Sequence, residues 1–498
     1  MSEGSPSNMF PTELFRFQRS ICDPIHGTIS LSNEEVAVID HRLFRRLHRI
    51  RQNGLLYLVF PAATHTRFEH SLGVLHLADE AFWYLLQNSY TGLSKKSVAE
   101  INDAEIGEAV AFHKIDAKIL ADFRRVLRFA ALVHDLGHGP FSHTFDSFAP
   151  KSAHLGTVLQ KEESLSNIRP LIDAIASIDG RVDHEQMSCV FFTRIWNELP
   201  NKQDGFTFRA DELPLLVSAA VLGEPGFVGN CKLEPFLSLL HDCLASAPVD
   251  CDRMDYLERD SRSIGVTYGL FSRERILKSL LCYKGTNDSR HQYRLGIKLS
   301  GIRAVENFIQ ARFELFVQVY YHKTNRATEL MLEKIAETAA GNDIDVFQPA
   351  TFDELVERYT KLSDESFLRM LCEEVENSEI KSIANRITNR DLWKRVWEGS
   401  RDIADEVLKR LRQIEPVHIF IDKIDPKATK GLEGGAYLLQ RKGSDTYKAQ
   451  DKADWLDRSP MIKALAKQEG EITRIYYTGV DGDTLEKLRS AAREYTPT

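Results

Sequence analysis

The stretch Ala131-Leu132-Val133-His134-Asp135-Leu136-Gly137-His138-Gly139-Pro140 decides the fold, because an apolar segment ends abruptly in an imidazole and a carboxylate. Helical spacing of the residues before it places His134 on the buried face of a helix. The glycines and Pro140 then end the helix and predict a pocket-lining loop, on which His143 follows. Burying such a pair is costly unless a cation holds it, although a lone His and Asp pair is more often structural than a ligand set.

Two further segments supply donors for a mononuclear metal site, which needs about four imidazole and carboxylate groups. His70 follows a capping-box pattern at residues 66–69, and helical spacing puts it on a buried stripe. Asp252 lies in a helix-favouring segment in which Asp252, Tyr256 and Asp260 are four residues apart and share one face. This stripe of three polar groups predicts a binding wall.

The order of these residues resembles the signature of a known superfamily. His70, the pair His134 and Asp135, and Asp252 are similar to the H…HD…D pattern of the HD-domain metal-dependent phosphohydrolases. Longer stretches resemble the deoxynucleoside triphosphate triphosphohydrolases, in the branch with SAM and HD domains. They are residues 23–27 (DPIHG), 46–54 (RLHRIRQNG), 60–62 (FPA), 67–74 (RFEHSLGV), 134–143 (HDLGHGPFSH) and 259–260 (RD), and the resemblance runs from about residue 18 to about residue 330.

The resemblance implies a divalent metal ion held by His70, His134, Asp135 and Asp252. Such an ion lowers the pKa of a water molecule and polarises a phosphoryl oxygen. The donor set leaves Mn, Mg, Fe, Ni and Zn open, because two imidazoles and two carboxylates suit each of these metals to a different degree.

Three more histidines, His138, His143 and His184, would surround the α-phosphate by the same resemblance. His184 is the expected general acid for the departing 5′-oxygen, and either Glu185 or Asp146 would orient it or hold its proton. The implied products are a nucleoside and inorganic triphosphate.

A triphosphate is highly negative, so its pocket needs fixed cations. Arg67, Arg253, Arg312 and Lys323 are the candidates, although each of them taken singly is more often an ordinary surface charge. Arg312 and Tyr320 are eight residues apart, which predicts one helix that presents both to the ligand.

Sugar contacts are expected from the segment that carries Asp252. The ring of Tyr256 would lie against the ribose and leave no room for a 2′-hydroxyl, which favours deoxyribose. Asp260 would accept a hydrogen bond from the 3′-hydroxyl, and Gln52 would also line the sugar.

The sequence departs from the family where a guanine nucleotide activator binds between subunits. Asp40 matches the acidic residue of that site, but Arg45 stands where Gln is usual and His48 where Arg is usual. The sequence therefore does not support GTP activation. Only about seventeen residues precede the resemblance, so we expect no SAM-type module ahead of the core.

Composition indicates a large globular enzyme of the cytoplasm. The chain has 498 residues, 43% of them hydrophobic, and a formal charge of 64 − 72 = −8. This acidic balance argues mildly against a broad nucleic-acid-coating surface, so nucleic acid is a conceivable but not an indicated partner. The seven cysteines form no CxxC pair and are expected to be free thiols, and no apolar run is long enough to span a membrane.

The sequence predicts a mainly α fold, with an HD-domain helical core and a smaller α+β C-terminal lobe. Residues 1–17 are expected to be mobile, 18–335 to form the catalytic core, and 336–498 to form a lobe for bracing or oligomerisation. In that lobe residues 417–421, 436–439 and 472–477 are strand candidates, followed by a helix over 483–495. Residues 91–118 are expected to be a helical excursion at the rim.

The function favoured by the sequence is metal-dependent hydrolysis of deoxynucleoside triphosphates by a homo-oligomer, a tetramer or a dimer. One alternative is another HD phosphohydrolase, acting on a nucleoside monophosphate, a signalling nucleotide or a nucleic-acid end, which would not need the triphosphate cations. The other is a nucleotide-sensing or nucleic-acid-binding defence protein in which hydrolysis is incidental.

Overall fold

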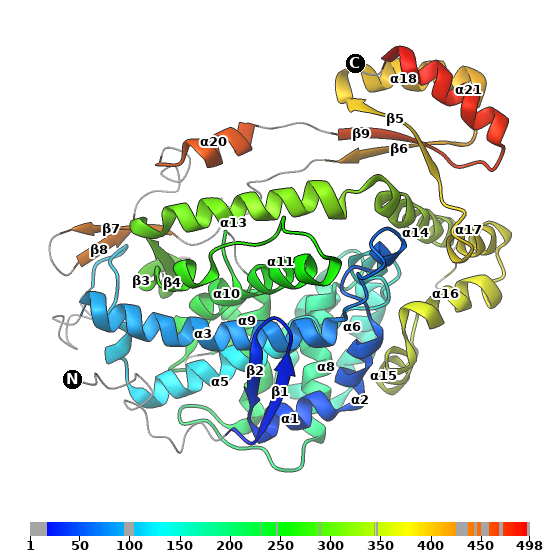
Figure 1. The fold of residues 1–498 in the computed structure, drawn as a ribbon. Coiled ribbons are helices and arrows are strands. Elements are labelled where there is room, and N and C mark those ends of the chain that lie inside the picture. The colour runs from blue at the N-terminus through cyan, green and yellow to red at the C-terminus, as the bar shows by residue number, and fades with distance from the viewer. Residues whose placement is uncertain are drawn as a thin grey trace.

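The computed structural model describes residues 17–93, 104–229, 231–245, 248–287, 290–342, 344, 347–424, 437–442, 446–449, 458–467 and 472–495. Helices dominate these residues and the sheets are small, so the predicted mainly α fold with a small α+β C-terminal part is confirmed. Most helices pack into one body, above which α18 (Arg401–Ile414) and α21 (Gly482–Ala492) stand with a sheet of their own (Figure 1). The segment predicted to be mobile, 1–17, lies outside the described residues except for Phe17.

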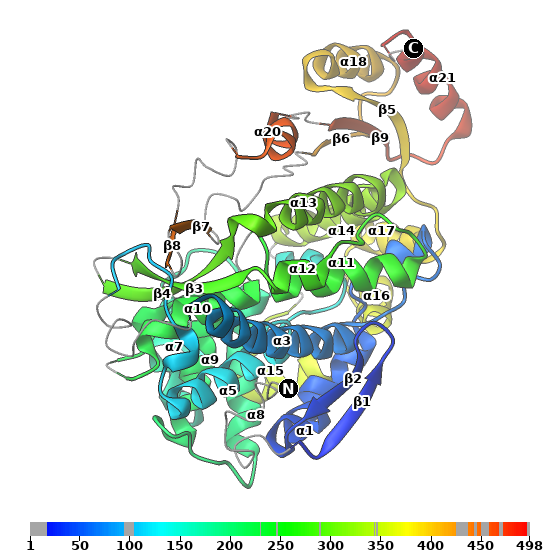
Figure 2. The same cartoon turned by 60° about the vertical axis from the view of Figure 1, so that its left-hand side comes forward.

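The core is built around α3 (Arg67–Leu93), a long helix that packs against both α5 (Ala117–Val133) and α11 (Cys251–Ile264). In Figures 1 and 2, α5 lies below α3 and α11 lies above it. The remaining helices of the body are α1 (Asn33–Asp40), α2 (Arg42–Arg45), α6 (Ser152–Gln160), α7 (Arg169–Ser177), α8 (His184–Glu198), α9 (Leu213–Leu222), α10 (Leu237–Ala245), α12 (Arg273–Leu277), α13 (Ile302–Leu315), α14 (Lys323–Gly341), α15 (Phe352–Lys361), α16 (Asp364–Glu373), α17 (Ser378–Thr388) and α20 (Pro460–Lys467).

Local sequence explains where the three central helices begin and end. The carboxylate of Asp116 accepts hydrogen bonds from the first backbone N–H groups of α5, and Asp250 does the same for α11. Helix α11 ends at Gly265, whose φ of 79° is the left-handed conformation that glycine adopts at low cost. At the start of α3, the backbone N–H of Thr66 donates to Glu69 Oε2 at 2.9 Å, one of the bonds of the predicted capping box.

The described strands form three separate sheets. An N-terminal antiparallel hairpin pairs β1 (Arg19–Asp23) with β2 (Gly27–Leu31). A second sheet has the order β3-β4-β7-β8, with β3 (Leu280–Asn287), β4 (Arg290–Lys298), β7 (Tyr437–Lys442) and β8 (Thr446–Ala449). A third has the order β5-β9-β6, with β5 (Lys394–Ser400), β9 (Ile472–Tyr477) and β6 (Ile419–Ile424).

The C-terminal strands belong to two of these sheets. The predicted strands at 417–421, 436–439 and 472–477 correspond to β6, β7 and β9, and α21 covers most of the predicted terminal helix. Strands β5, β9 and β6 carry α18 and α21 on one apolar face, whereas β7 pairs in parallel with β4 of the core. The division at residue 335 stays a prediction, and residue 436, the first of the second predicted strand, lies outside the described residues.

The helical excursion expected over 91–118 is not seen at residues 104–116, while residues 94–103 lie outside the described part of the chain. Helix α3 continues to Leu93 and α5 begins at Ala117, but residues 104–116 between them are largely irregular apart from one short turn of 3-10 helix. Glu108 and Ala109 form β-bridges with Lys448 and Tyr283, so tertiary pairing with the core sheet decides this segment rather than helix propensity. In the described part of the chain no helix combines the length and the apolar character needed to cross a membrane.

Gly73 lets α11 approach α3 closely at the centre of the fold. A Cβ atom at this position would overlap Asp255 Oδ1 and Arg259 Nη2. Both atoms belong to buried groups that are already hydrogen bonded to each other, so neither can move away at low cost. A residue without a side chain is therefore required where the two helices meet.

We predict that Gly73→Ala destabilises the fold by about 1–3 kcal/mol, because the added methyl group forces α3 and α11 apart. Gly92→Ala is the matched control in the same helix, since its Cβ would meet only Tyr447 at 3.6 Å. Chemical denaturation of the two variants tests this. Equal free energies of unfolding in Gly73→Ala and the parent protein would contradict the close packing described here.

Candidate active site

Three of the four predicted metal ligands converge from the three central helices. His70 comes from α3, His134 from the end of α5 and Asp252 from the first turn of α11, and one donor atom of each lies within 4.8 Å of the others. His70 Nε2 is 3.0 Å and His134 Nε2 is 3.7 Å from Asp252 Oδ1. Both nitrogens are buried and neither has a hydrogen bond of good geometry within the described structure. Such orphaned donors fit a metal ion.

Asp135 completes the set from the other side. Its Oδ2 is 3.4 Å from His70 Nε2, its Oδ1 is 3.5 Å from His134 Nε2, and Oδ2 also accepts a hydrogen bond from Arg67 Nη1. Burial alone would raise the pKa of Asp135, but Arg67 and His134 hold it well below its usual value. Asp135 therefore lies beside the cluster of His70, His134 and Asp252, where it could serve as a fourth ligand of a divalent cation.

The pKa values of the two histidines indicate that the cluster favours positive charge. Burial lowers the pKa of His70, but the neighbouring carboxylates of Asp252 and Asp255 outweigh burial and raise it to about 10. The pKa of His134 is likewise raised, because Asp135 and Asp252 outweigh its burial. Protons on the imidazoles thus balance the carboxylates, and a bound cation would replace them.

The second nitrogen of each histidine is also fixed. His70 Nδ1 donates to Asp255 Oδ2 at 2.7 Å, and His134 Nδ1 donates to the carbonyl of Ala131 at 2.8 Å. These bonds leave the Nε2 lone pairs for a metal, which is how metal-binding histidines are usually oriented. Asp255 is held in turn by His26 at 2.6 Å and by Arg259 at 2.8 Å.

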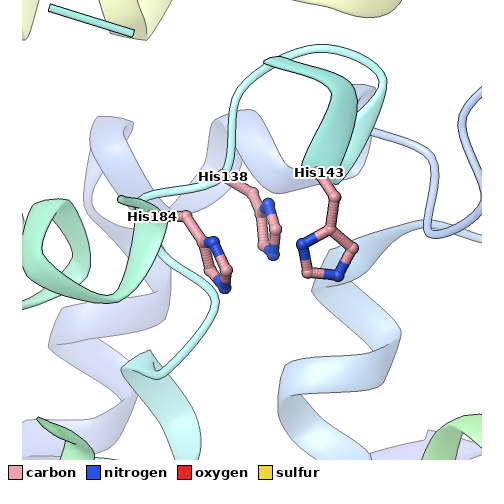
Figure 3. A group of neighbouring side chains, drawn as sticks. All are labelled: His138, His143 and His184. Atoms are coloured by element: carbon pink, nitrogen blue, oxygen red, sulfur yellow. The ribbon is translucent and has the colours of Figure 1, made fainter. Parts of the chain in front are cut away.

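A second group of histidines lies beside the metal cluster. His138, His143 and His184 come from the loop after α5, from the turn at Ser142–Ser147 and from the start of α8, and their rings gather at one place (Figure 3). The rings of His138 and His184 are stacked, with their centroids 3.7 Å apart. The ring of His143 lies across them, with its centroid 4.9 Å from that of His138 and 5.1 Å from that of His184. His138 is fully buried, whereas 75% of the His143 side chain is exposed.

The pKa values of His138 and His184 are shifted in opposite directions. Burial, together with Arg67 and His184, lowers the pKa of His138 well below its usual value, so this ring is neutral. Burial also lowers the pKa of His184, but Asp146 and Glu185 outweigh it and raise the value. Asp146 Oδ2 is 3.5 Å from His184 Nδ1, and Glu185 Oε1 is 3.9 Å from Nε2. Both expected orienting carboxylates are therefore near His184, with Asp146 the closer.

A cavity of about 300 Å³ opens beside the two clusters. Its size is at the lower end of the range for small-molecule sites. Six of the predicted catalytic and substrate residues line it: Gln52, Arg67, His143, Tyr256, Asp260 and Tyr320. Other residues in its wall include Asn53, Leu55, Phe316, Tyr321, Asn325 and Glu329.

One wall of the cavity is a hydrogen-bonded pair of aromatic and acidic residues. Tyr320 donates from its hydroxyl to Asp260 Oδ2 at 2.5 Å, while Asp260 Oδ1 lies 2.7 Å from His65 Nε2. The ring of Tyr256 lies 6.5 Å from that of Tyr320. Gln52 is nearly buried, and its Oε1 has no hydrogen-bond partner among the residues that the structure describes.

The predicted cations are not all brought to this cavity. Arg67 lines it, but Arg253 is hydrogen bonded to the buried carboxylate of Asp250. The guanidinium of Arg312 lies 4.7 Å from the centre of the Phe316 ring, and it also forms a hydrogen bond with Tyr256. Arg253 and Arg312 therefore are not among the residues that line this cavity.

The single helix expected to present both Arg312 and Tyr320 differs from the structure. Helix α13 ends at Leu315, a π-helical turn spans Phe316–Tyr320, and α14 begins only at Lys323. The eight-residue spacing assumed a regular α-helix, whereas a π turn inserts an extra residue. Lys323 lines a different cavity, with Arg390 and Lys394, and its role as a phosphate-binding cation stays a prediction.

Sequence reasoning missed several residues that hold the site. Asp255 and His65 bind predicted site residues directly, and the buried Arg46 donates to the carbonyl of His138 at 2.6 Å. Arg46 falls within the quoted stretch 46–54, and Asp255 is an acid on the helix that carries Asp252. Those signals were available, but nothing in the sequence pairs His65 with Asp260, which is 195 residues away.

Comparisons with known proteins find two families. Residues 67–188 match the HD domain, and residues 284–419 match the HD associated region. A solved structure of a hypothetical protein from Aquifex aeolicus has a TM-score of 0.61 at 23% identity. It covers 95% of this chain and 99% of its own, which shows a common fold.

The relatives include characterised and uncharacterized proteins. The chain is 28% identical to the uncharacterized protein YwfO of Bacillus subtilis, over 78% of this chain and 74% of that protein. It is 26% identical to the deoxynucleoside triphosphate triphosphohydrolase SAMHD1 of Homo sapiens, over 76% of this chain and 55% of that protein. For the Mus musculus protein of the same name the identity is 28%, over 78% of this chain and 56% of that protein. The chain thus spans little more than half the length of the triphosphohydrolase relatives. The chain therefore contains an HD domain followed by an HD associated region, as the matches over residues 67–188 and 284–419 show.

Proposed function

We propose that this protein hydrolyses deoxynucleoside triphosphates to a deoxynucleoside and inorganic triphosphate. The observation that carries the proposal is the cavity that has Arg67 and His143 beside the metal cluster and Tyr256, Asp260 and Tyr320 in its wall. A phosphate chain and a sugar could therefore lie in one pocket, next to the groups that would act on the bond between them. The names of the SAMHD1 relatives support the same substrate class.

The divalent cation would be held by His70, His134, Asp135 and Asp252, and it would supply a more acidic water and Lewis-acid stabilisation of phosphoryl charge. Its identity stays open among Mn, Mg, Fe, Ni and Zn. Arg67 would neutralise the phosphate chain, and the exposed His143 would bind an α-phosphate oxygen.

Proton transfer to the leaving 5′-oxygen would come from His184. The carboxylates of Asp146 and Glu185 favour the protonated form of this imidazole, which is the form that a general acid needs. His138 is stacked on His184, and because its pKa is lowered it would stay neutral beside the protonated ring.

Sugar recognition would use the wall opposite the metal. Asp260 already accepts hydrogen bonds and would accept another from a 3′-hydroxyl, while Tyr256 would press against C2′ and exclude ribose. Gln52 brings an unpaired carbonyl oxygen to the same region. Arg253 would bind a phosphate only after breaking its contact with Asp250, and Arg312 only after breaking its contact with Tyr256.

We further propose a homo-oligomer, a tetramer or a dimer, in the cytoplasm, with residues 336–498 acting as a bracing or oligomerisation lobe of a catalytic core at 18–335. An HD phosphohydrolase for another nucleotide or for nucleic-acid ends is the second candidate. It is favoured by the single phosphate-facing cation, Arg67, in the lining of the described cavity.

The bond that is cleaved tests the proposal directly. Incubation of purified protein with Mn²⁺ or Mg²⁺ and each dNTP should release inorganic triphosphate, detected by phosphorus NMR. Pyrophosphate with a nucleoside monophosphate would place the cut at another bond. No product from any dNTP, alone or mixed, would contradict the proposed activity.

Asp135→Ala should reduce triphosphate release by a factor on the order of 100 or more and lower the metal content of the purified protein, because the ion loses a ligand. Asp402→Asn is the matched control, since Asp402 is an exposed carboxylate in the first turn of α18. An Asp135→Ala protein that keeps parental rate and metal content would exclude the proposed metal site.

Tyr256→Ala should lower the preference for dNTPs over NTPs by about tenfold, because the space beside C2′ is opened to a hydroxyl group. The ratio of kcat/KM for dGTP and GTP measures this preference. Tyr268→Ala removes an exposed tyrosine and serves as the control. Equal selectivity in Tyr256→Ala and the parent would remove Tyr256 from this role.

A further inference from the structure

The loop that carries His143 has an unusual backbone. Phe141 and Ser142, which precede it, have φ values of 62° and 58°, the left-handed region that non-glycine residues rarely adopt. Two such residues in succession persist only where the surrounding structure holds them. The position of His143 therefore depends on whatever fixes this turn.

The contact that fixes it comes from a distant part of the chain. Asp364, in the first turn of α16, accepts a hydrogen bond from the backbone N–H of Phe141 at 2.8 Å through Oδ1. Its Oδ2 accepts another from the backbone N–H of Arg51 at 3.0 Å. Only 1% of this side chain is exposed. One carboxylate of the HD associated region thus joins two loops of the active site.

Hydrogen bonds continue from this junction to the metal cluster. Ser142 Oγ lies 2.9 Å from the carbonyl of Arg51 and 3.0 Å from that of Gln52, and it accepts from Arg67 Nε at 3.0 Å. The same guanidinium is hydrogen bonded to Asp135. The loop held by Asp364 therefore sets the positions of Gln52, Arg67 and His143 together.

A purely local role does not account for this carboxylate. An acidic residue in the first turn of a helix favours the helix dipole, but the exposed Glu365 beside it can do that. Burial raises the pKa of Asp364 to about 6 despite the two backbone hydrogen bonds, so its placement opposes the preference of a carboxylate for water. A carboxylate that is buried at this cost is expected to have a role in fixing the conformation of the backbone that it binds.

We propose that Asp364 is a positioning residue, which sets the geometry of the turn at Phe141 and Ser142 and thereby the placement of His143 against the phosphate. The expected effect of Asp364 on turnover rests on the proposed function. Its effect on the turn itself is independent of any substrate. This role makes α16 of the HD associated region part of the catalytic arrangement, although no residue of α16 lines the cavity.

The test compares Asp364→Asn, Asp364→Ala and the control Glu365→Gln in the full-length protein. Asparagine keeps the shape of the side chain but can accept from only one of the two backbone amides, while alanine accepts from neither. We expect kcat for dNTP hydrolysis to fall about tenfold to a hundredfold in Asp364→Asn with KM changed less than about threefold, since a small displacement of His143 suffices. The metal content should be unchanged, because the four ligands keep their own partners.

Hydrogen–deuterium exchange provides the second measurement and needs no substrate. Peptides covering residues 139–147 should exchange about tenfold faster in Asp364→Asn and Asp364→Ala than in the parent, whereas those covering α5 should not change. Glu365→Gln should match the parent in both measurements. Parental exchange of this loop in both Asp364 variants would overturn the proposal even if the protein proved inactive on dNTPs. Faster exchange of the loop with parental kcat in an active enzyme would also overturn it.

Discussion

The burial of His70, His134 and Asp135, with the half-buried Asp252 beside them, at the meeting point of α3, α5 and α11 is the constraint on which the rest of the structure depends. His70, His134, Asp135 and Asp252 come from distant segments, and each would be costly to bury alone. Their mutual positions require that α11 reach α3 closely, which Gly73 permits. The packing of the core and the chemistry of the site thus follow from one arrangement of helices.

A shell of hydrogen bonds keeps that arrangement rigid. Asp255 holds His70 and is itself held by His26 and Arg259, so the N-terminal hairpin is tied to the metal cluster. On the opposite side, Arg46 holds the carbonyl of His138. Preorganised groups of this kind bind a transition state without further ordering, because the cost of orienting them was met on folding. The exposed His143 and the cavity beside it are the parts of the site left open to a ligand.

Sequence reasoning reached the features that depend on local spacing. Helical periodicity placed His70 and His134 on buried faces, and alternation marked β6, β7 and β9. It failed where contacts between distant segments of the chain determine the local structure. The hairpin of β3 and β4 was missed because its residues pair with each other and with β7, which lies about 140 residues away. A π-helical turn breaks the regular helix that the spacing of Arg312 and Tyr320 assumed, and the hydrogen bond between Asp364 and Phe141 spans 223 residues.

The position of a bound metal tests the central claim most directly. Crystals of the protein grown with Mn²⁺ or Fe²⁺ and measured at the absorption edge of that metal would locate it by anomalous scattering. The account predicts a peak between His70 Nε2, His134 Nε2, Asp135 and Asp252. A peak held by His138, His143 and His184 alone, or no peak among the four residues in a protein that hydrolyses nucleotides, would contradict it.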